Sequence, residues 1–307
     1  MRTKSRAAFC SSIARWLAFY NLVVQVDSEL NKKNEQKKKV VVLDLPPSVK
    51  EIVLNIGSNK DPILPRAASG PCAVTLAFEP VIPELIPEHP QILPEAVSDS
   101  SSLATMYKYN RDGVSSSLSK TAADSFWNTG DKKMGVKIVP VASMADVLQS
   151  IPSHVTIDFI QTDAQGYDFA MIQAGIEKIL ARGVKFPKTE TYTDNVITYQ
   201  GVDNDLCLHW IPFMTANGYS LIGTTHDYNQ GFNPVDKVLQ ACARQQKSSS
   251  DPKAGLKEAD ALWKLSSVTG VVDHFRFAYP ILSKTPLSFT DQDYEVCKRA
   301  PSSLRRG

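Results

Sequence analysis

Short apolar runs, each followed by polar or small residues, recur along the chain from about residue 40 onward. Such runs are typical of buried strands, because a strand inside a parallel sheet is apolar on both faces and stops at turn-forming residues. The strands expected from this pattern are 51–56, 73–78, 91–97, 136–141, 155–160, 184–192, 219–223 and 275–281.

A helical period separates several of these strands. Apolar residues at spacings of three and four form one face of a helix after the strand at 155–160, namely Phe169, Ile172, Ile176 and Ile179. A shorter helix is expected over 144–149. Strands that alternate with amphipathic helices predict an α/β fold, in which a mostly parallel sheet is flanked by helices on both faces.

The first 39 residues differ in composition from the rest. Basic residues precede the first acid, Asp27, and the apolar stretch at 16–26 is shorter than the roughly 20 residues of a membrane-spanning helix. Its apolar positions suit an amphipathic helix, so a targeting presequence, a weak signal-anchor and a surface helix all stay open. The basic run at 31–39 is typical of a solvated linker or of a tether to anionic lipid. We therefore expect 1–39 to be a targeting or membrane-associating segment with a linker; without that role the protein would be cytoplasmic.

The remaining chain is long enough for one large domain. We expect 40–231 to form the domain of alternating strands and helices. Residues 232–307 would complete the same domain as a helical extension, with helices over 234–245 and 256–265. The sequence does not indicate an oligomeric state.

The net charge and the cysteine and histidine content argue against several classes of function. The net charge of +2 lacks the strong basic excess of dedicated nucleic-acid binders, so no nucleic-acid partner is expected. The five cysteines are odd in number and no two have CxxC spacing, which favours reduced thiols over a disulfide framework. The five histidines include no HxxxH pair, and no metal site is expected.

Polar residues follow four of the predicted strands. They are Gly57-Ser58-Asn59 after the first strand, Glu79 after the second, Asp99 after the third and Asp163 after the strand at 155–160. The carboxyl ends of parallel strands meet at one edge of the sheet, where α/β folds bind ligands. Each residue alone is also explained by a turn, because Asp and Asn are favoured there. As a group they predict a ligand site.

The first of these loops, in the stretch VLNIGSNKDP at 53–62, contains a single glycine, Gly57. A dinucleotide loop needs G-x-G-x-x-G, because the backbone must approach a pyrophosphate closely. S-adenosylmethionine carries no phosphate, and one glycine is enough for its methionine part. Glu79 can accept hydrogen bonds from the ribose hydroxyls of either cofactor, so it does not discriminate between S-adenosylmethionine and NAD. The glycine count and Asp163 favour S-adenosylmethionine over NAD.

The blocks VLNIGSN, AFEP, AVSD and IDFIQTDAQGYDFAMIQAGIEKIL, in this order, resemble the FkbM-type methyltransferases. That family is a branch of the class I S-adenosylmethionine-dependent superfamily, and the resemblance covers roughly 53–219. It implies the Rossmann-like fold of that superfamily, with a mostly parallel central sheet flanked by helices, and S-adenosylmethionine as cofactor. The candidate cofactor-binding residues are then Asn55, Gly57, Ser58, Asn59, Glu79, Asp99 and Asp163.

The sequence departs from the family pattern in the first loop. Asn55 stands where the family usually has an acid, and Lys60-Asp61-Pro62 replaces the usual glycine after Asn59. An amide hydrogen-bonds an ammonium group without charge assistance. These departures leave open a weaker cofactor site or a degenerate fold that binds no cofactor.

Three residues are candidates for the chemistry. Asp163 would position the cofactor or act as general base for a hydroxyl acceptor, and its alternative role is to cap the following helix. His226, in the loop sequence GTTHDYN, is a second candidate base, unless it is simply solvated. The resemblance makes Glu190 a candidate for the acceptor pocket; its alternative is an ion pair with Lys188. The segment 112–127 is either part of that pocket or a serine-rich loop.

The leading prediction is therefore an S-adenosylmethionine-dependent methyltransferase that methylates oxygen on a small-molecule or glycan acceptor. One alternative is a scaffold that retains the fold without the chemistry. The other is an NAD(P)-binding oxidoreductase, which the missing glycines disfavour. Association with a membrane, if any, is expected through 1–39.

Overall fold

The computed structural model describes residues 43, 45, 49–59, 62–63, 72–81, 92–109, 113, 115–122, 133–192, 199–225, 232–245 and 258–268. All of them belong to one compact unit, Val41–Gly307. Residues 1–39, the strand expected at 275–281 and the candidate base His226 lie outside the described residues.

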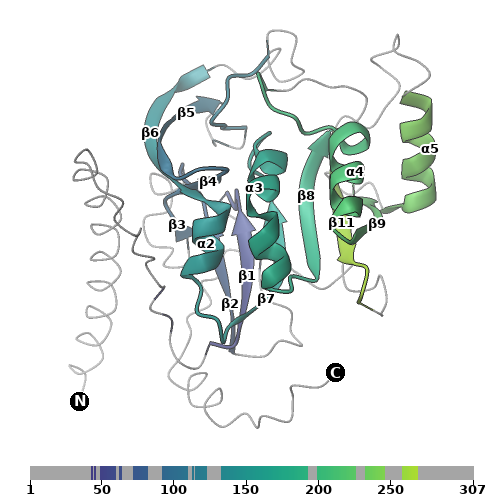
Figure 1. Ribbon diagram of the computed structural model, residues 1–307. Coiled ribbons are helices and arrows are strands. Elements are labelled where there is room, and N and C mark those ends of the chain that lie inside the picture. Colours follow the sequence, from purple (N-terminus) through teal and green to yellow (C-terminus); the bar gives the residue numbers. More distant parts are fainter. Residues whose placement is uncertain are drawn as a thin grey trace, which may run out of the picture. The chain divides into compact units, whose positions relative to one another are not determined.

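Eight of the described strands form a sheet in the order β10-β9-β11-β8-β7-β1-β2-β3 (Figure 1). In chain order these strands are β1 (Glu51–Ile56), β2 (Ala73–Phe78), β3 (Ile92–Leu93), β7 (Thr156–Thr162), β8 (Phe186–Tyr192), β9 (Tyr219–Thr225), β10 (Phe232–Pro234) and β11 (Glu258–Leu265). The pairs from β3 through β8 are parallel, whereas β11 is antiparallel to both β8 and β9. The predicted mixed α/β fold with a mostly parallel central sheet is confirmed.

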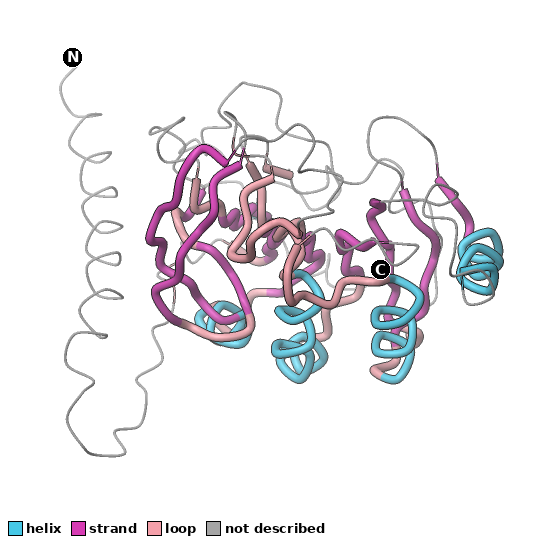
Figure 2. The backbone as a smooth tube through the Cα atoms, turned by 90° about the horizontal axis from the view of Figure 1, so that it is seen from above, coloured by secondary structure: helices cyan, strands magenta, loops and turns pink. Residues whose placement is uncertain are grey.

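The described helices include the three that were predicted, near 144–149, after the strand at 155–160 and at 234–245, and two within 206–216 that were not. They are α2 (Met144–Ser150), α3 (Asp168–Ala181), the π-helix η4 (Leu206–Trp210), α4 (Ile211–Ala216) and α5 (Val235–Gln245). Figures 1 and 2 show α2, α3 and α4 along the same face of the sheet. The predicted inner face of α3 is buried at Phe169, Ile172 and Ile179. None of the described helices combines the length and apolar character that crossing a membrane requires.

A second sheet of three strands, in the order β4-β6-β5, lies in the chain between β3 and α2. It consists of β4 (Ala96–Ser98), β5 (Ser102–Tyr109) and β6 (Lys133–Ser143). Its inner side chains, among them Met106, Val139 and Val141, pack in a core cluster with Val81 from the end of β2. This sheet therefore lies against the carboxyl end of β2.

The strand expected at 91–97 is wrong as a single element. The chain pairs with β2 only at Ile92–Leu93, and Ala96–Ser98 pairs with β6 in the second sheet. Pro94 separates the two pieces, because a residue without an N–H cannot continue a sheet ladder. Asp99 consequently follows a strand of the second sheet and not the third strand of the main sheet.

The helix expected at 256–265 is also wrong, because Glu258–Leu265 forms the strand β11. The segment is rich in good helix formers, and its sequence EADALWKL gave the helical prediction. In the fold it fills the gap between β8 and β9, where Ala261, Leu262 and Trp263 are almost completely buried. Sheet pairing and burial on both sides outweigh local propensity here.

The prediction of reduced cysteines is contradicted. Cys207 of η4 and Cys242 of α5 form a disulfide across 35 positions of sequence, with their Cα atoms 5.4 Å apart. Cys72 is disulfide-bonded as well. The first bond joins α5 to the helical segment ahead of β9, and spacing alone could not have revealed it.

Candidate functional site

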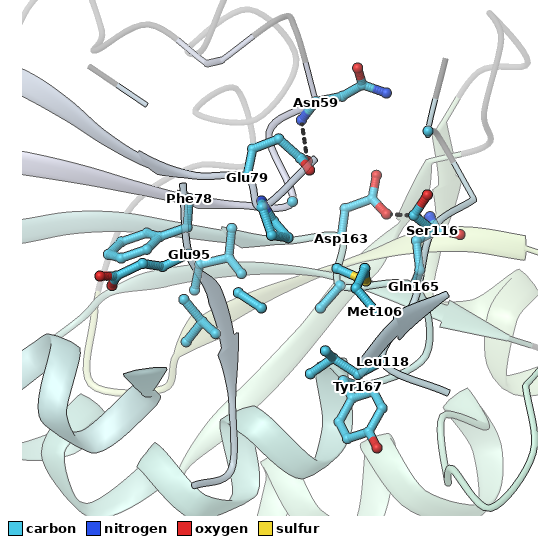
Figure 3. A pocket seen from close by; sticks show the side chains of 17 residues that line it. Asn59, Phe78, Glu79, Glu95, Met106, Ser116, Leu118, Asp163, Gln165 and Tyr167 are labelled. Carbon is cyan, nitrogen blue, oxygen red and sulfur yellow. Dashed lines mark hydrogen bonds between the residues drawn. The ribbon is translucent and has the colours of Figure 1, made fainter. Parts of the chain in front are cut away.

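A pocket opens where the carboxyl ends of β1, β2 and β7 meet the second sheet (Figure 3). It contains about 580 Å³ of empty space, part of which is open to solvent. One side is formed by the segment after β1 and by the end of β2, and the other by β4, β5 and the turn that precedes α3.

The single glycine of the first loop allows two segments of the protein to touch. Gly57 has φ +71°, and a Cβ atom at this position would collide with the backbone carbonyl of Asp163. The amide of Gly57 donates to the carbonyl of Phe78 (2.9 Å), and the amide of Asp163 donates to that of Ile56 (2.9 Å). The glycine is therefore needed to bring the loop after β1 against the end of β7, whatever ligand the pocket holds.

Glu79, directly after β2, has its carboxylate fixed by two backbone amides. Its Oε2 accepts from the amide of Asn59 (3.0 Å) and its Oε1 from that of Val81 (2.9 Å) (Figure 3). Burial raises the pKa of Glu79, and these two hydrogen bonds and the charge of Lys137 oppose that rise. The pocket thus holds a largely desolvated carboxylate in one orientation.

Gln165 connects the ends of β7 and β8. Its Nε2 donates to Oδ1 of Asp163 (2.6 Å) and to Oε1 of Glu190 (3.1 Å). Its Oε1 lies 2.7 Å from the hydroxyl of Tyr199. The backbone of Gln165 has φ +51°, a conformation that residues other than glycine rarely adopt. Its backbone carbonyl accepts a hydrogen bond from the hydroxyl of Ser117 (2.7 Å). Such a network holds Asp163 in position at the edge of the pocket.

The comparison with protein families is decisive for identity. The model of the Methyltransferase FkbM domain matches residues 51–221, which is more than half of the chain. This protein belongs to the FkbM methyltransferase family. No curated protein and no solved structure matches it.

As an FkbM methyltransferase, the protein is an S-adenosylmethionine-dependent enzyme. The matched region runs from β1 into β9 and includes every loop that lines the pocket. Four of the predicted cofactor-binding residues line this pocket, namely Gly57, Asn59, Glu79 and Asp163. The structure therefore brings together the residues that follow β1, β2 and β7, as parallel topology predicts.

Two other predicted residues, Asn55 in β1 and Ser58 in the loop after it, do not line the pocket of the FkbM methyltransferase. Asn55 is buried, and its Oδ1 accepts from the amide of Ile63 (2.8 Å). Ser58 is also buried and donates to the carbonyl of Asn59 (3.3 Å). Both side chains bond to the backbone of the segment that follows β1. The replacement of the family's usual acid at position 55 therefore changes no side chain that lines the pocket.

Asp99 and Glu190 also lie outside this pocket. Asp99 borders a second cavity on the second sheet. Glu190 lies in β8 and is linked to the pocket wall by its hydrogen bond with Gln165. Lys188, its alternative partner, forms an ion pair with Asp260 (2.7 Å).

The turn of the FkbM methyltransferase between β7 and α3 is held by Asp168, which the motif contained but the candidate list did not. Both carboxylate oxygens of Asp168 accept from the amide of Ala164, at 3.0 and 3.2 Å. Complete burial raises its pKa to about 6, and hydrogen bonds from the turn oppose the rise. Helix α3 begins at Asp168 and its N-cap is Tyr167, so Asp163 is not in a capping position. The alternative role of Asp163 as a helix cap is therefore wrong.

The charged side chains that line the pocket are acidic, and the nearby Lys137 donates to the carbonyl of Pro80 (3.4 Å) without lining it. Glu79, Glu95 and Asp163 line it, and among the described residues no lysine, arginine or histidine does. Burial raises the pKa of Glu95 as it does that of Glu79. A pocket of this kind favours a ligand that carries positive charge and disfavours a phosphate-bearing one.

Besides Asp168, three residues of this region were not among the predicted ones. Gln165 lay inside the motif that identified the family, but its contacts with Glu190 and Tyr199 depend on the fold. Glu95 enters the pocket because the chain breaks at Pro94, which was the one available signal. Tyr199 gave no signal.

Proposed function

We propose that this FkbM methyltransferase binds S-adenosylmethionine in the pocket at the ends of β1, β2 and β7 and transfers its methyl group to an oxygen acceptor. The observation that carries the proposal is the charge of the lining: three carboxylates and, among the described residues, no basic side chain. S-adenosylmethionine bears a positive sulfonium and an ammonium group and no phosphate. NAD(P) would bring a pyrophosphate next to these carboxylates, which is electrostatically unfavourable.

Individual residues fit parts of the cofactor. Glu79 presents a fixed carboxylate at the end of β2, where it would accept the two ribose hydroxyls. Gly57 brings the first loop close to the pocket floor. The carboxylate of Asp163 would attract the positive charge of the methionine part and orient it.

Oxygen methylation is proposed because Asp163, a carboxylate that lines the pocket, would accept the proton of a hydroxyl acceptor. When bound, the cofactor supplies an electrophilic methyl group on a positively charged sulfur. The acceptor oxygen would form the new O–C bond while the electron pair of the broken S–C bond would stay on sulfur, and Asp163 would accept the hydroxyl proton. Gln165 fixes the orientation of Asp163 for this proton transfer.

The alternative of a scaffold without chemistry rests on Asn55 and on the loop that begins at Lys60. Asn55 supports the backbone at Ile63 and does not line the pocket. The three lining carboxylates are all present despite the change at Asn55, which argues for a working site. The acceptor is proposed to be a small molecule or a glycan and not a nucleic acid, in keeping with the net charge of +2.

Calorimetric titration of the full chain with S-adenosylmethionine, S-adenosylhomocysteine and NAD tests this proposal. We expect micromolar dissociation constants for the first two and no binding of NAD. A folded protein that binds NAD, or none of the three, would contradict the proposal. The fold would be monitored in the same samples by circular dichroism.

A further inference from the structure

A second cavity lies beside the cofactor pocket, on the second sheet. It contains about 510 Å³ of empty space and is open to solvent. Two residues, Leu118 and Tyr167, line both cavities. The two cavities are therefore adjacent and meet at the side chains of Leu118 and Tyr167.

Asp99 borders this cavity because Pro94 moves the following residues into the second sheet. Its Oδ1 accepts from the hydroxyls of Ser98 (2.9 Å) and Ser100 (3.4 Å). The loop is anchored by Ser101, whose Oγ accepts from the amide of Ser143 (2.8 Å) and donates to Asp146 of α2 (2.5 Å). The carboxylate is thus presented by a fixed loop.

The lining is rich in hydroxyl groups and carries no described basic side chain. Besides Asp99, its polar side chains are Ser98, Ser100, Ser102, Thr105, Tyr107 and Tyr167. Lys120 lies over the ring of Tyr107, 5.7 Å from its centroid, and does not line the cavity. A carboxylate can accept hydrogen bonds from two neighbouring hydroxyl groups, and serine and threonine hydroxyls can both donate and accept them. The ring of a tyrosine can pack against the C–H groups of a ligand. This combination suits a neutral molecule with several hydroxyl groups and disfavours a phosphorylated or acidic one.

We infer that the second cavity is the acceptor site of this methyltransferase and that it takes a neutral polyhydroxylated acceptor of the sugar class, held by Asp99. This inference rests on the proposed function. One acceptor hydroxyl would reach the cofactor pocket past Leu118 and Tyr167 and would receive the methyl group there. Its proton goes to Asp163, and the electron pair of the broken S–C bond stays on sulfur. Asp99, which the sequence analysis assigned to the cofactor, is thereby reassigned to the acceptor.

Saturation-transfer difference NMR with the full chain tests this inference, because the method detects millimolar binding. The probes are neutral methyl glycosides of common hexoses, with glucose 6-phosphate for comparison, all in the presence of S-adenosylhomocysteine. Two variants alter the cavity: Asp99→Asn removes the charge, and Ser102→Trp fills the space. Asp203→Asn is the control, because the side chain of Asp203 is 75% exposed and lies outside both cavities.

We expect signals from neutral glycosides that fall at least fivefold in Asp99→Asn and Ser102→Trp and stay unchanged in Asp203→Asn. The dissociation constant of S-adenosylhomocysteine should stay within threefold in all three variants. No signal from any neutral glycoside, an equal signal in the cavity variants, or a preference for the phosphorylated sugar would overturn the acceptor assignment while cofactor binding stands. If the wild-type chain did not bind S-adenosylhomocysteine, the proposed function would be overturned, and the acceptor assignment with it.

Discussion

Gly57 and Asp163 lie so close together that a side chain at position 57 would collide with the backbone carbonyl of residue 163. The loop after β1 and the turn after β7 are packed backbone to backbone, and the hydrogen bond from the amide of Asp163 to the carbonyl of Ile56 (2.9 Å) joins them. This contact explains why the loop has one glycine. It also places Asp163 at the pocket that Glu79 borders.

The first prediction concerns this contact. Gly57→Ala should lower the free energy of unfolding by about 3 kcal/mol or more, because a main-chain atom must move to admit the methyl group. Gly183→Ala is a matched control, since Gly183 also has positive φ (+64°) but no atom within 4 Å of an added Cβ. It should cost only the backbone strain of about 1–2 kcal/mol. Urea denaturation of both variants measures the difference, and equal losses would contradict the steric explanation.

The second prediction concerns Gln165. Gln165→Leu removes the two N–H donors that lie between Asp163 and Glu190, so it should destabilise the fold by about 3 kcal/mol. It should also weaken S-adenosylmethionine about tenfold, because the orientation of Asp163 is lost. Gln149→Leu, at an exposed position of α2, is the control and should change neither quantity. Unchanged cofactor affinity in a destabilised Gln165→Leu would show that Gln165 has only a structural role.

The third prediction concerns the disulfide between Cys207 and Cys242. A crosslink across 35 positions stabilises a fold by up to about 4 kcal/mol through the entropy of the unfolded chain. The double variant Cys207→Ser, Cys242→Ser should therefore melt at a lower temperature than the oxidised wild type. A reductant should lower the melting temperature of the wild type more than that of the variant. Mass spectrometry of non-reduced peptides tests the bond itself, and free thiols at both positions would refute it.

The fourth prediction concerns Asp168, whose pKa of about 6 in the folded protein exceeds its ordinary value of 3.8. The folded state therefore binds this proton more tightly than the unfolded state. The stability from this group is complete below about pH 4 and is lost as the pH rises through about 6. Between pH 5 and pH 7 the free energy of unfolding should fall more in the wild type than in Asp168→Asn. Parallel pH profiles for the two proteins would show that Asp168 titrates normally.

Much of the site was predictable from sequence because it depends on strand ends. Apolar runs mark β1, β2 and β7, and parallel pairing brings Gly57, Glu79 and Asp163 to one edge without any further information. The error at Asp99 came from reading through Pro94, which ends one strand and starts another in a different sheet. Because proline lacks the N–H that a sheet ladder needs, Pro94 is itself a sequence signal for the break.

Other features could not be predicted, because they depend on contacts between distant residues. The segment at 258–265 has the composition of a helix, and only the gap between β8 and β9 makes it a strand. The contacts of Gln165 with Glu190 and Tyr199 join positions 25 and 34 residues apart. The same holds for the disulfide between Cys207 and Cys242. Local pattern carries no information on such pairs.

The most direct test of the central claim is the affinity of the full chain for S-adenosylmethionine in the wild type, in Glu79→Gln and in Glu177→Gln. Glu177 is an exposed residue of α3 outside the pocket, so it is the matched control. The account predicts that Glu79→Gln weakens binding at least tenfold, about 1.4 kcal/mol or more, because charged hydrogen bonds to the ribose are lost. Glu177→Gln should bind like the wild type. Equal affinity in all three proteins would contradict the assignment of this pocket to the cofactor.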